Sequence, residues 1–542
     1  MTRVALLVLP LIALAPASAP ADETSATDKL RILYSTRFTF TDGGLPLVTV
    51  EIMGKQQRVT LRAKGGIVVR PDGAGGSAVE AEDGEAWTIT AEGGTPEVIQ
   101  DWTVVETLEA DDASGIAAAL ARWKSRGFDP RSFEIGTVFG TAGEIIDTRD
   151  VRIAIDPVAA GKGAARAAEH AKRFGVRVLV HQELVKRPAG VIVAKSGGAT
   201  IRNPSVLWFT PRRAVETITV EDVPTNTGGS QLVTGKEDRR YWGAVYVTLD
   251  RDGSLLVANA VPEDKLLAGL VPAEMYPDAP PQALEAQAIA ARTELLEKIG
   301  RRNLTDPFLL CSTQQCQVYA GAGKEDPRTT KAVEKTRGMV LLRDGGGLVD
   351  VRYSASCGGH GENNDAIWGG APDPSLRGRP DTAKGGMTKI TDANIGAFLD
   401  GGEEAWCAKG KLAKGRFRWT ETIRASELGA RVAAELPEIG RVKALVPKQR
   451  GGSGRISTLA IQGDRGTAEV SGDLRIRRLL GGLKSTLFEV HRDGDAFVFH
   501  GAGFGHGVGM CQMGAMGMAG AGKTHAQILA HYYRGTHLHK LY

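Results

Sequence analysis

Two short stretches in the second half of the chain gather side chains that could do acid–base chemistry. The first, RYSASCGGHGE from Arg352 to Glu362, brings hydroxyls, a thiol, an imidazole and a carboxylate together after a predicted strand over 348–353. The second, GAGFGHGVGMCQ from Gly501 to Gln512, places His506 among alternating glycines before a predicted helix. Such glycines let the backbone come close to a ligand or to a neighbouring loop. The G-x-G-x-x-G spacing is never met, which excludes a dinucleotide-binding loop.

A third stretch centres on Glu274, which is flanked by Val271, Pro272, Met275 and Tyr276. A carboxyl group in an apolar loop braced by proline loses solvation, which raises its pKa and keeps a proton available near neutrality. A general acid for glycosidic bond cleavage needs this property. A partly exposed glutamate without a catalytic role is the alternative, and the loop alone favours that alternative.

Two predicted helices would hold Glu274 between them. A strand over 255–259 leads to a helix that begins at Pro262 and runs through Leu270. A second helix opens at Pro280 and Pro281, where a missing N–H costs nothing, and Gly300 can end it. The loop between these helices contains Glu274.

The N-terminal half has a different character. Residues 22–100 alternate as short strands with glycine-rich turns, which predicts a β-rich domain. Residues 101–193 show strands around two helices, 113–125 and 163–174, which predicts an α+β module of split βαβ type. Residues 194–240 return to β character and connect to a mixed helix and strand domain over 241–542. We therefore expect a multidomain α+β protein.

The N-terminus and the composition limit where the protein works. Arg3, the apolar run from Val4 to Ala15 and the small residues after it form a secretory signal, which we expect to end at Ala21. The rest of the sequence has no apolar stretch long enough to span a membrane. The 67 basic and 63 acidic residues leave a net charge of +4, which gives no reason to expect nucleic acid. We expect an exported protein of the periplasm or cell envelope.

A series of motifs makes the second half similar to a known family. VPAEM, ALEAQAIAART, CQVYAG, YSASCGGHGE, FGHGVGMCQMGA and HYYRGT occur in this order between Tyr241 and Tyr542. This region resembles the sporulation stage II protein D/LytB (SpoIID/LytB) family. The first 240 residues lie outside the resemblance. The module over 101–193 resembles the SPOR peptidoglycan-binding domain in its layout but has no specific motif of that domain, so an accessory domain with another role is the favoured alternative.

The resemblance implies an activity. Sporulation members are lytic transglycosylases that cut glycan strands stripped of stem peptides, whereas LytB members modify a cell-wall amidase. It implies that Glu274 is the catalytic residue. It also implies that the following residues contact substrate: Gln287, Arg292, Tyr353, Ser354, Ser356, His360, His506 and Gln512. To these we add Glu362, which is the one obvious candidate for a second acid. The expected partners are peptidoglycan glycan strands and an amidase.

The sequence departs from the family pattern at Glu285, where lysine is usual. Glu285 and Arg292 are about two helical turns apart, so a contact between their side chains is one possible consequence. Some members bind zinc just before CQVY, but residues 301–316 contain no histidine, so we expect neither metal nor cofactor there. A disulfide between Cys311 and Cys316 is expected instead.

The other three cysteines leave further alternatives. A second disulfide between Cys357 and Cys407 is a weaker expectation, and Cys511 stands where many members have serine. A thiol hydrolase built on Cys357 and His360 is the least favoured function, because neighbours on one turn rarely meet as a catalytic pair. A non-catalytic wall-binding protein that activates an amidase is the main rival to the transglycosylase.

Overall fold

The computed structural model describes most of the chain. The described residues are 33–35, 39–41, 43–71, 78–80, 85–141, 144–204, 206–226, 234–312, 319–410 and 412–542. The expected signal segment, residues 1–21, and Cys316 lie outside them. Among the described residues, no helix is both long and apolar enough to cross a membrane.

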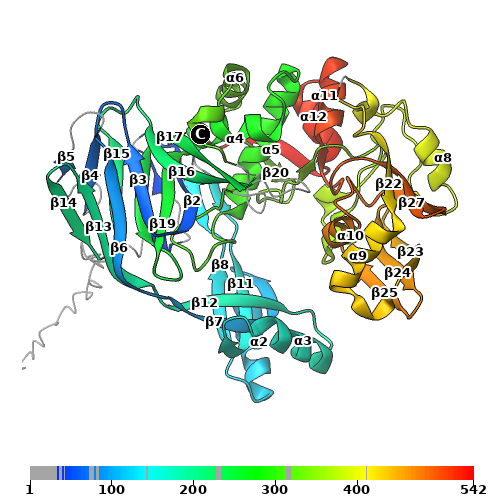
Figure 1. Ribbon diagram of the computed structural model, residues 1–542, viewed down its shortest axis with the longest axis horizontal. Coiled ribbons are helices and arrows are strands. Elements are labelled where there is room, and N and C mark those ends of the chain that lie inside the picture. Colours follow the sequence, from blue (N-terminus) through cyan, green and yellow to red (C-terminus); the bar gives the residue numbers. More distant parts are fainter. Residues whose placement is uncertain are drawn as a thin grey trace, which may run out of the picture.

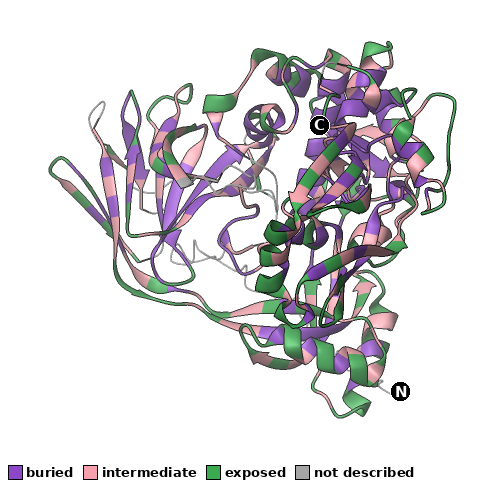
Figure 2. Cartoon of the chain, turned by 45° about the vertical axis from the view of Figure 1, so that its right-hand side comes forward, coloured by how far each residue is buried: buried purple, intermediate pink, exposed green. Residues whose placement is uncertain are grey.

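Two antiparallel sheets form a sandwich, at the left of Figure 1. The larger sheet has the order β1 (Thr39–Phe40), β2 (Pro46–Gln56), β19 (Leu255–Pro262), β18 (Ala244–Leu249), β15 (Val206–Pro211), β4 (Ile67–Arg70), β5 (Val79–Glu80). The smaller has the order β14 (Ala199–Asn203), β13 (Ala189–Ser196), β6 (Trp87–Thr95), β3 (Arg58–Arg62), β16 (Ile218–Asn226), β17 (Thr234–Tyr241). Their inward side chains, including Trp87 and Phe209, make one core. Figure 2 shows buried residues along these strands.

An α+β module interrupts the sandwich between β6 and β13 (Figure 1, bottom). Its elements run β7 (Val98–Glu109), α2 (Ala113–Ser125), β8 (Arg131–Ile135), a hairpin of β9 (Val138–Thr141) and β10 (Glu144–Asp147), β11 (Asp150–Ala159), α3 (Gly163–Phe174) and β12 (Leu179–Lys186). The sheet order is β12-β7-β11-β8. This is the split βαβ arrangement, so the prediction for this module is confirmed, and both helices have the expected bounds.

The expected domain boundary at residue 241 falls inside the sandwich. β18 and β19 follow this position, yet they pair with β15 and β2 in the larger sheet. Residues 194–240 likewise supply sandwich strands rather than a separate connecting segment. Long-range strand pairing of this kind has no local signal in the sequence.

A helical layer joins the sandwich to the rest of the chain. It contains α4 (Glu263–Glu274), α5 (Pro281–Lys298), α6 (Pro327–Lys335), α11 (Gln512–Gly520) and α12 (His525–Tyr532), together with the strand pair β20 (Met339–Arg343) and β29 (Thr536–Lys540). α5 is buried on nearly every side, and its leucines Leu295 and Leu296 reach the sandwich core. This layer fixes the position of the end of α4.

The last part is an outer lobe at the right of Figure 1. It holds two three-stranded sheets, β22 (Arg418–Arg424), β27 (Ala496–Ala502), β26 (Phe488–Asp493) and β23 (Val442–Arg450), β24 (Ile456–Gly463), β25 (Thr467–Ser471). Its helices are α7 (Asn364–Trp368), α8 (Ile395–Asp400), α9 (Ala425–Glu435) and α10 (Asp473–Leu479). The short strands β21 (Tyr353–Ser354) and β28 (Met510–Cys511) connect this lobe to the helical layer. Short 3₁₀ turns complete the described elements: η1 (Ala322–Lys324), η2 (Pro374–Leu376), η3 (Trp406–Ala408) and η4 (Pro437–Ile439).

Candidate active-site cleft

A cleft of about 1010 Å³ lies where the helical layer meets the outer lobe. Its walls come from the end of α4, from α5, from β21, from α7 and α10, and from the loop before β28. Of the positions predicted from the sequence, five line it: Glu274, Tyr353, Ser354, His506 and Gln512. Residues more than two hundred positions apart in the chain thus share one cavity.

Parallel pairing between β21 and β28 brings the two polar motifs together. Tyr353 pairs with Met510 and Ser354 with Cys511. The loops that flank these strands also hydrogen-bond, since the Gly507 N–H donates to Ser354 Oγ at 3.2 Å. The Phe504 N–H donates to the Ser356 carbonyl at 2.8 Å. The expectation that the glycines permit close approach to a neighbouring loop is confirmed.

Two of these glycines show why no other residue fits. Gly509 has φ of 69°, and a Cβ there would lie 2.0 Å from the Arg352 carbonyl oxygen. Gly507 has φ of 75°, and its Cβ would lie 2.4 Å from the Arg455 guanidinium carbon. Both positions combine a left-handed backbone with contact against another segment, which only glycine tolerates at low cost.

Glu274 is the last residue of α4, where a loop was expected after Leu270. The helix continues through Pro272 because the final turn closes with a hydrogen bond from the Met275 N–H to the Val271 carbonyl. The Gln512 side-chain amide donates to the Glu274 carbonyl at 2.8 Å and to Gln287 Oε1 at 3.2 Å. The half-buried Glu274 thus projects from a helix end that the first residue of α11 holds in place.

Tyr353 connects Glu274 with a second carboxylate in the cleft. Burial raises the pKa of the Tyr353 hydroxyl well above its usual value, and the negative charges of Glu294 and Glu274 raise it further. The hydroxyl hydrogen-bonds to the Glu294 side chain. Tyr353 therefore stays protonated, and its one hydroxyl proton is donated to Glu294 in the neighbourhood of Glu274.

The remaining carboxylates of the cleft wall are paired with cations. Glu294 forms an ion pair with Lys298, and Asp350 lies 2.6 Å from Arg352. Asp473 lies 3.3 Å from Arg477 and accepts from Thr486 Oγ1 at 2.8 Å. Each of these three carboxylates thus has a cation within ion-pair distance in the cleft wall.

His506 is neutral at physiological pH. Burial lowers its pKa to about 4, and the positive charges of Arg455 and Arg352 act in the same direction. Its Nδ1 accepts from the Val508 N–H at 3.0 Å, which leaves Nε2 as the protonated nitrogen of the neutral ring. His506 can therefore donate one hydrogen bond in the cleft.

Trp368 is a wall residue that the sequence analysis missed. It ends α7, its side chain is 51% exposed, and its ring centroid lies 5.0 Å from that of His506. The Arg352 guanidinium lies 5.6 Å from the same ring centroid. The sequence offered only a weak signal, a tryptophan followed by Gly369 and Gly370, because single exposed apolar side chains are common on protein surfaces.

Arg292 and Gln287 were expected to contact substrate, and the structure places both away from the cleft. Arg292 is fully buried and forms an ion pair with Glu263 at 2.6 Å, and it also donates to the Thr336 carbonyl at 2.7 Å. Gln287 is fully buried behind Gln512. Both side chains point from α5 into the protein interior. Because α5 is buried on nearly every side, the helical spacing of its apolar residues could not show which of its polar side chains reach the cleft.

Glu285 does not contact Arg292. Its carboxylate, 4% exposed, accepts from Gln282 Nε2 at 2.7 Å and lies 3.0 Å from His525 Nδ1 and 3.4 Å from Lys335 Nζ. These partners belong to the helical layer and none lines the cleft. The glutamate in place of lysine is therefore accommodated at a distance from Glu274.

Ser356, His360 and Glu362 also lie outside the cleft lining. Glu362 is 1% exposed and accepts from Ser453 Oγ at 2.6 Å and from the Gly452 N–H at 2.9 Å, so it anchors a turn of the outer lobe. The expectation that it could serve as a second acid is not supported by this position. His360 is buried, and its Nδ1 lies 2.7 Å from the Gly361 carbonyl oxygen.

The cysteines are arranged differently from the expectation. Cys311 is disulfide-bonded, and its expected partner Cys316 lies outside the described residues. Cys357, Cys407 and Cys511 are free and buried, and the Sγ atoms of Cys357 and Cys407 are 3.6 Å apart. The second disulfide is therefore not formed in this structure, and the Cys357 thiol lies outside the cleft.

Comparisons with known proteins match two segments of the chain that contribute residues to the cleft. Residues 251–342, which include Glu274 and all of α5, match the family model described as Stage II sporulation protein. Residues 362–509, which contain the outer lobe, match a domain of unknown function (DUF8618).

Curated relatives cover about half of the chain. An uncharacterized protein of Brachyspira hyodysenteriae is 28% identical over 295 residues, which are 54% of this chain and 71% of that protein. The Stage II sporulation protein D of Bacillus subtilis is 26% identical over 54% of this chain and 79% of its own length. The Amidase enhancer of Bacillus subtilis is 31% identical over 50% of this chain, and the match spans only 40% of that protein. Residues 251–342 therefore match the Stage II sporulation protein family model, and about half of the chain is similar to curated relatives at modest identity.

Proposed function

We propose that the protein is an exported lytic transglycosylase of peptidoglycan that uses Glu274 as its general acid and base. The observation that carries this proposal is the position of Glu274 in the cleft. Glu274 ends α4 in the cleft wall, where Gln512 holds its backbone carbonyl and where Tyr353, Ser354 and His506 line the same cavity.

One carboxyl group is sufficient for this reaction. The Glu274 carboxylic acid gives its proton to the glycosidic oxygen while the bond from C1 to that oxygen breaks and an oxocarbenium-like centre forms. The resulting carboxylate then takes the proton of the sugar's own 6-hydroxyl, and O6 bonds to C1 to close a 1,6-anhydro ring. Ordinary glycoside hydrolysis would need a second carboxylate to activate water or to act as nucleophile.

The charge of the cleft suits glycan strands that have lost their stem peptides. Removal of the peptide leaves a free lactyl carboxylate on each N-acetylmuramic acid residue. The cleft wall carries five cations, of which Lys298, Arg352 and Arg477 are paired with carboxylates of the same wall. Arg302 and Arg475 are the candidates to balance such charges. The exposed face of Trp368 offers an apolar surface for a sugar ring in the same cavity.

A Glu274→Gln variant tests the proposal. Purified wild-type protein and the variant are incubated with intact and with amidase-treated peptidoglycan, and the products are identified by mass. The wild type should release 1,6-anhydro sugars, with the larger yield from amidase-treated strands, and Glu274→Gln should release none while keeping its thermal unfolding temperature. Glu403→Gln, an exposed position, is the matched control. Failure of the wild type to release anhydro products from either substrate would refute the proposal.

Activation of a cell-wall amidase is the second candidate function. It is favoured by the relative named Amidase enhancer and by the large N-terminal half, which the family match does not include. Stimulation of a purified amidase that persists in Glu274→Gln, together with no sugar release by the wild type, would identify this function instead.

A further inference from the structure

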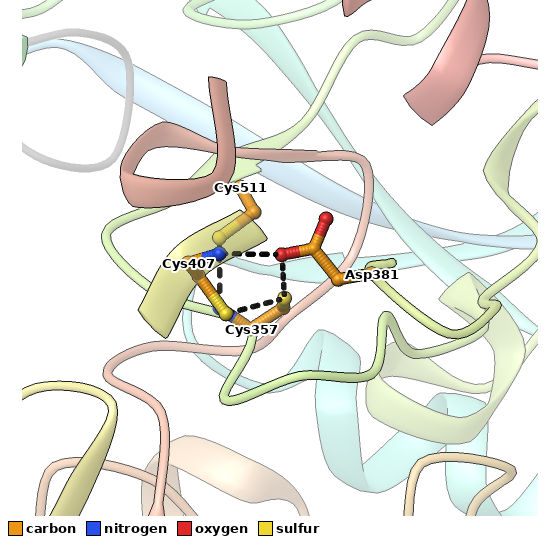
Figure 3. A group of neighbouring side chains, drawn as sticks. All are labelled: Cys357, Asp381, Cys407 and Cys511. Atoms are coloured by element: carbon orange, nitrogen blue, oxygen red, sulfur yellow. Dashed lines mark hydrogen bonds between the residues drawn. The ribbon is translucent and has the colours of Figure 1, made fainter. Parts of the chain in front are cut away.

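Three thiols and one carboxylate meet in the interior beside the cleft (Figure 3). Cys357 follows β21, Asp381 lies in the loop after η2, Cys407 is in η3, and Cys511 ends β28. Their possible ligand atoms all lie within 4.8 Å of one another, and each residue is at most 1% exposed. Four segments of the chain thus bring three sulfur atoms and one carboxylate oxygen, all possible metal ligands, to one place.

We propose that Cys357, Asp381, Cys407 and Cys511 bind one zinc ion as a structural site. Three thiolates and a carboxylate oxygen supply the four ligands of a tetrahedral zinc centre. Bonds of about 2.3 Å to sulfur place two ligands of a tetrahedron about 3.7 Å apart. The Sγ atoms of Cys357 and Cys407 are 3.6 Å apart, and Cys357 Sγ lies 3.3 Å from Asp381 Oδ2.

Neighbouring groups orient these ligands as the outer partners of a metal site do. The Asp381 Oδ2 atom faces the sulfurs, whereas its Oδ1 accepts from the Tyr532 hydroxyl at 2.9 Å. The sulfur of Cys511 accepts from the backbone N–H groups of Cys357 at 3.1 Å and Gly514 at 3.3 Å. These hydrogen bonds favour a negatively charged Cys511 sulfur and hold the Asp381 carboxylate in one orientation.

Close packing keeps the cluster together. A Cβ at Gly514 would lie 2.0 Å from the Tyr532 hydroxyl oxygen and 2.8 Å from Asp381 Oδ2, so glycine is required where α11 begins. A Cβ at Gly517 would lie 2.1 Å from the Trp406 carbonyl oxygen, next to Cys407. The first turns of α11 therefore press against both the carboxylate and η3.

Charge argues for a cation in this position. His531 Nε2 lies 3.4 Å from Asp381 Oδ1, whereas the other oxygen, Oδ2, faces the sulfurs. Placing this oxygen beside three sulfurs in the interior is costly unless a positive charge is near it, and a divalent ion bound directly supplies that charge. The nearby Arg418 donates instead to backbone carbonyls, at 2.8 Å to Gly358 and 2.7 Å to Leu399. A disulfide could join only two of the three cysteines, and would leave the third sulfur and the carboxylate in the same space.

The proposed ion would hold the cleft walls in place without contacting substrate. None of its four ligands lines the cleft. However, Cys511 pairs with Ser354 across β21 and β28 and immediately precedes Gln512, whose amide holds the end of α4. The ligands of this site are spread over 154 positions between Cys357 and Cys511, so no spacing motif announces them.

Metal analysis of the full-length purified protein, together with a thiol count after denaturation in chelator, tests the site. We expect one zinc per chain and three titratable thiols, those of Cys357, Cys407 and Cys511. Replacement of zinc by cobalt should add a thiolate-to-cobalt absorption band in the near ultraviolet. Folded wild-type protein without stoichiometric metal would overturn the proposal. A single titratable thiol would also do so, because it would show that two of these cysteines form a disulfide.

Two variants locate the ion. Cys407→Ser should lose most of the zinc and the cobalt band, and Cys311→Ser, the control at the other cysteine segment, should keep both. Zinc that is retained in Cys407→Ser but lost from Cys311→Ser would assign the metal to the other segment and overturn the proposal. If Cys407→Ser does not fold, the zinc content and thiol count of the wild type still decide the question.

Discussion

The side-chain amide of Gln512 donates a hydrogen bond to the backbone carbonyl of Glu274 at 2.8 Å, across 238 positions of the chain. The carbonyl belongs to the last turn of α4, where helix carbonyls lack partners within the helix. Gln512 therefore fixes the helix end that carries the proposed catalytic carboxyl group.

We expect Gln512→Met, which keeps the length of the side chain but removes the donor, to lower kcat about tenfold, because a lost hydrogen bond of about 1.4 kcal/mol would let Glu274 move from its reactive position. KM should change little. Sugar release from amidase-treated glycan measures both constants. Gln449→Met, at an exposed strand position, is the control, and an unchanged kcat in Gln512→Met would contradict the positioning role.

Arg292 should matter for stability and not for substrate binding. Its guanidinium and the Glu263 carboxylate form a fully buried ion pair, and Glu263 also accepts from the Tyr542 hydroxyl at 2.7 Å. Arg292→Met leaves a buried carboxylate without its cation, which costs about 3–5 kcal/mol. We expect the free energy of unfolding in urea to fall by this amount, with KM unchanged for the protein that remains folded.

An exposed ion pair provides the control for Arg292. Arg431 and Glu427 lie 2.7 Å apart on α9 with both side chains open to solvent, and Arg431→Met should change the free energy of unfolding by less than about 0.5 kcal/mol. A rise in KM for Arg292→Met without loss of stability would restore the substrate-binding role that the family resemblance implied.

His506 should make the fold sensitive to acid. Its pKa in the folded protein is about 4, below the ordinary histidine pKa of 6.5 that applies to the unfolded chain. Between these values the unfolded chain takes up a proton that folded His506 does not. The stability that His506 contributes is therefore fully present above pH 6.5 and is lost as the pH falls toward 4.

In His506→Asn the new side chain can still accept from the Val508 N–H. Between pH 7 and pH 5 we expect the free energy of unfolding of the wild type to fall by about 1–2 kcal/mol more than that of this variant. The range allows for solvent screening of a half-buried ring. Urea unfolding at several pH values measures the difference. His537→Asn, at an exposed position, should follow the wild type. Equal slopes for wild type and His506→Asn would show that His506 is not the group that titrates.

Local patterns predicted individual elements well. The bounds of α2 and α3 follow from helical spacing of apolar residues, and the split βαβ order follows from the sequence of elements. Where tertiary contacts decide, the prediction differed from the structure. The helix after Pro262 was expected to end at Leu270, but α4 continues through Pro272 to Glu274, whose carbonyl accepts a hydrogen bond from Gln512 of α11.

The site was predicted by motif and refined by burial. Glu274, Tyr353, Ser354, His506 and Gln512 meet in the cleft as expected. Motif membership alone could not separate these cleft-lining residues from buried residues such as Arg292 and Glu362. The same motifs supply both the side chains that line the cleft and the side chains that pack behind them. Exposed partners such as Trp368 belong to no motif that the sequence analysis recognised.

The α+β module can be removed without breaking the sandwich strands. β6 ends at Thr95 and β13 begins at Ala189, and these two residues are directly paired. The Thr95 hydroxyl donates to the Ala189 carbonyl at 3.2 Å. The two ends of residues 96–188 are thus adjacent, and a short glycine-containing turn can join β6 to β13 as an ordinary hairpin.

We expect the chain that lacks residues 96–188 to fold, and to release sugars from soluble, amidase-treated glycan at a rate within about twofold of wild type, because none of the cleft-lining residues belongs to the module. If the module grips the wall, as its split βαβ layout suggests, the shortened chain should sediment less with insoluble peptidoglycan. Sedimentation and sugar release measured on the same preparations separate the two roles. Unchanged sedimentation would rule out wall binding by the module, whereas loss of sugar release from soluble glycan by a folded chain would show that the module supports the cleft.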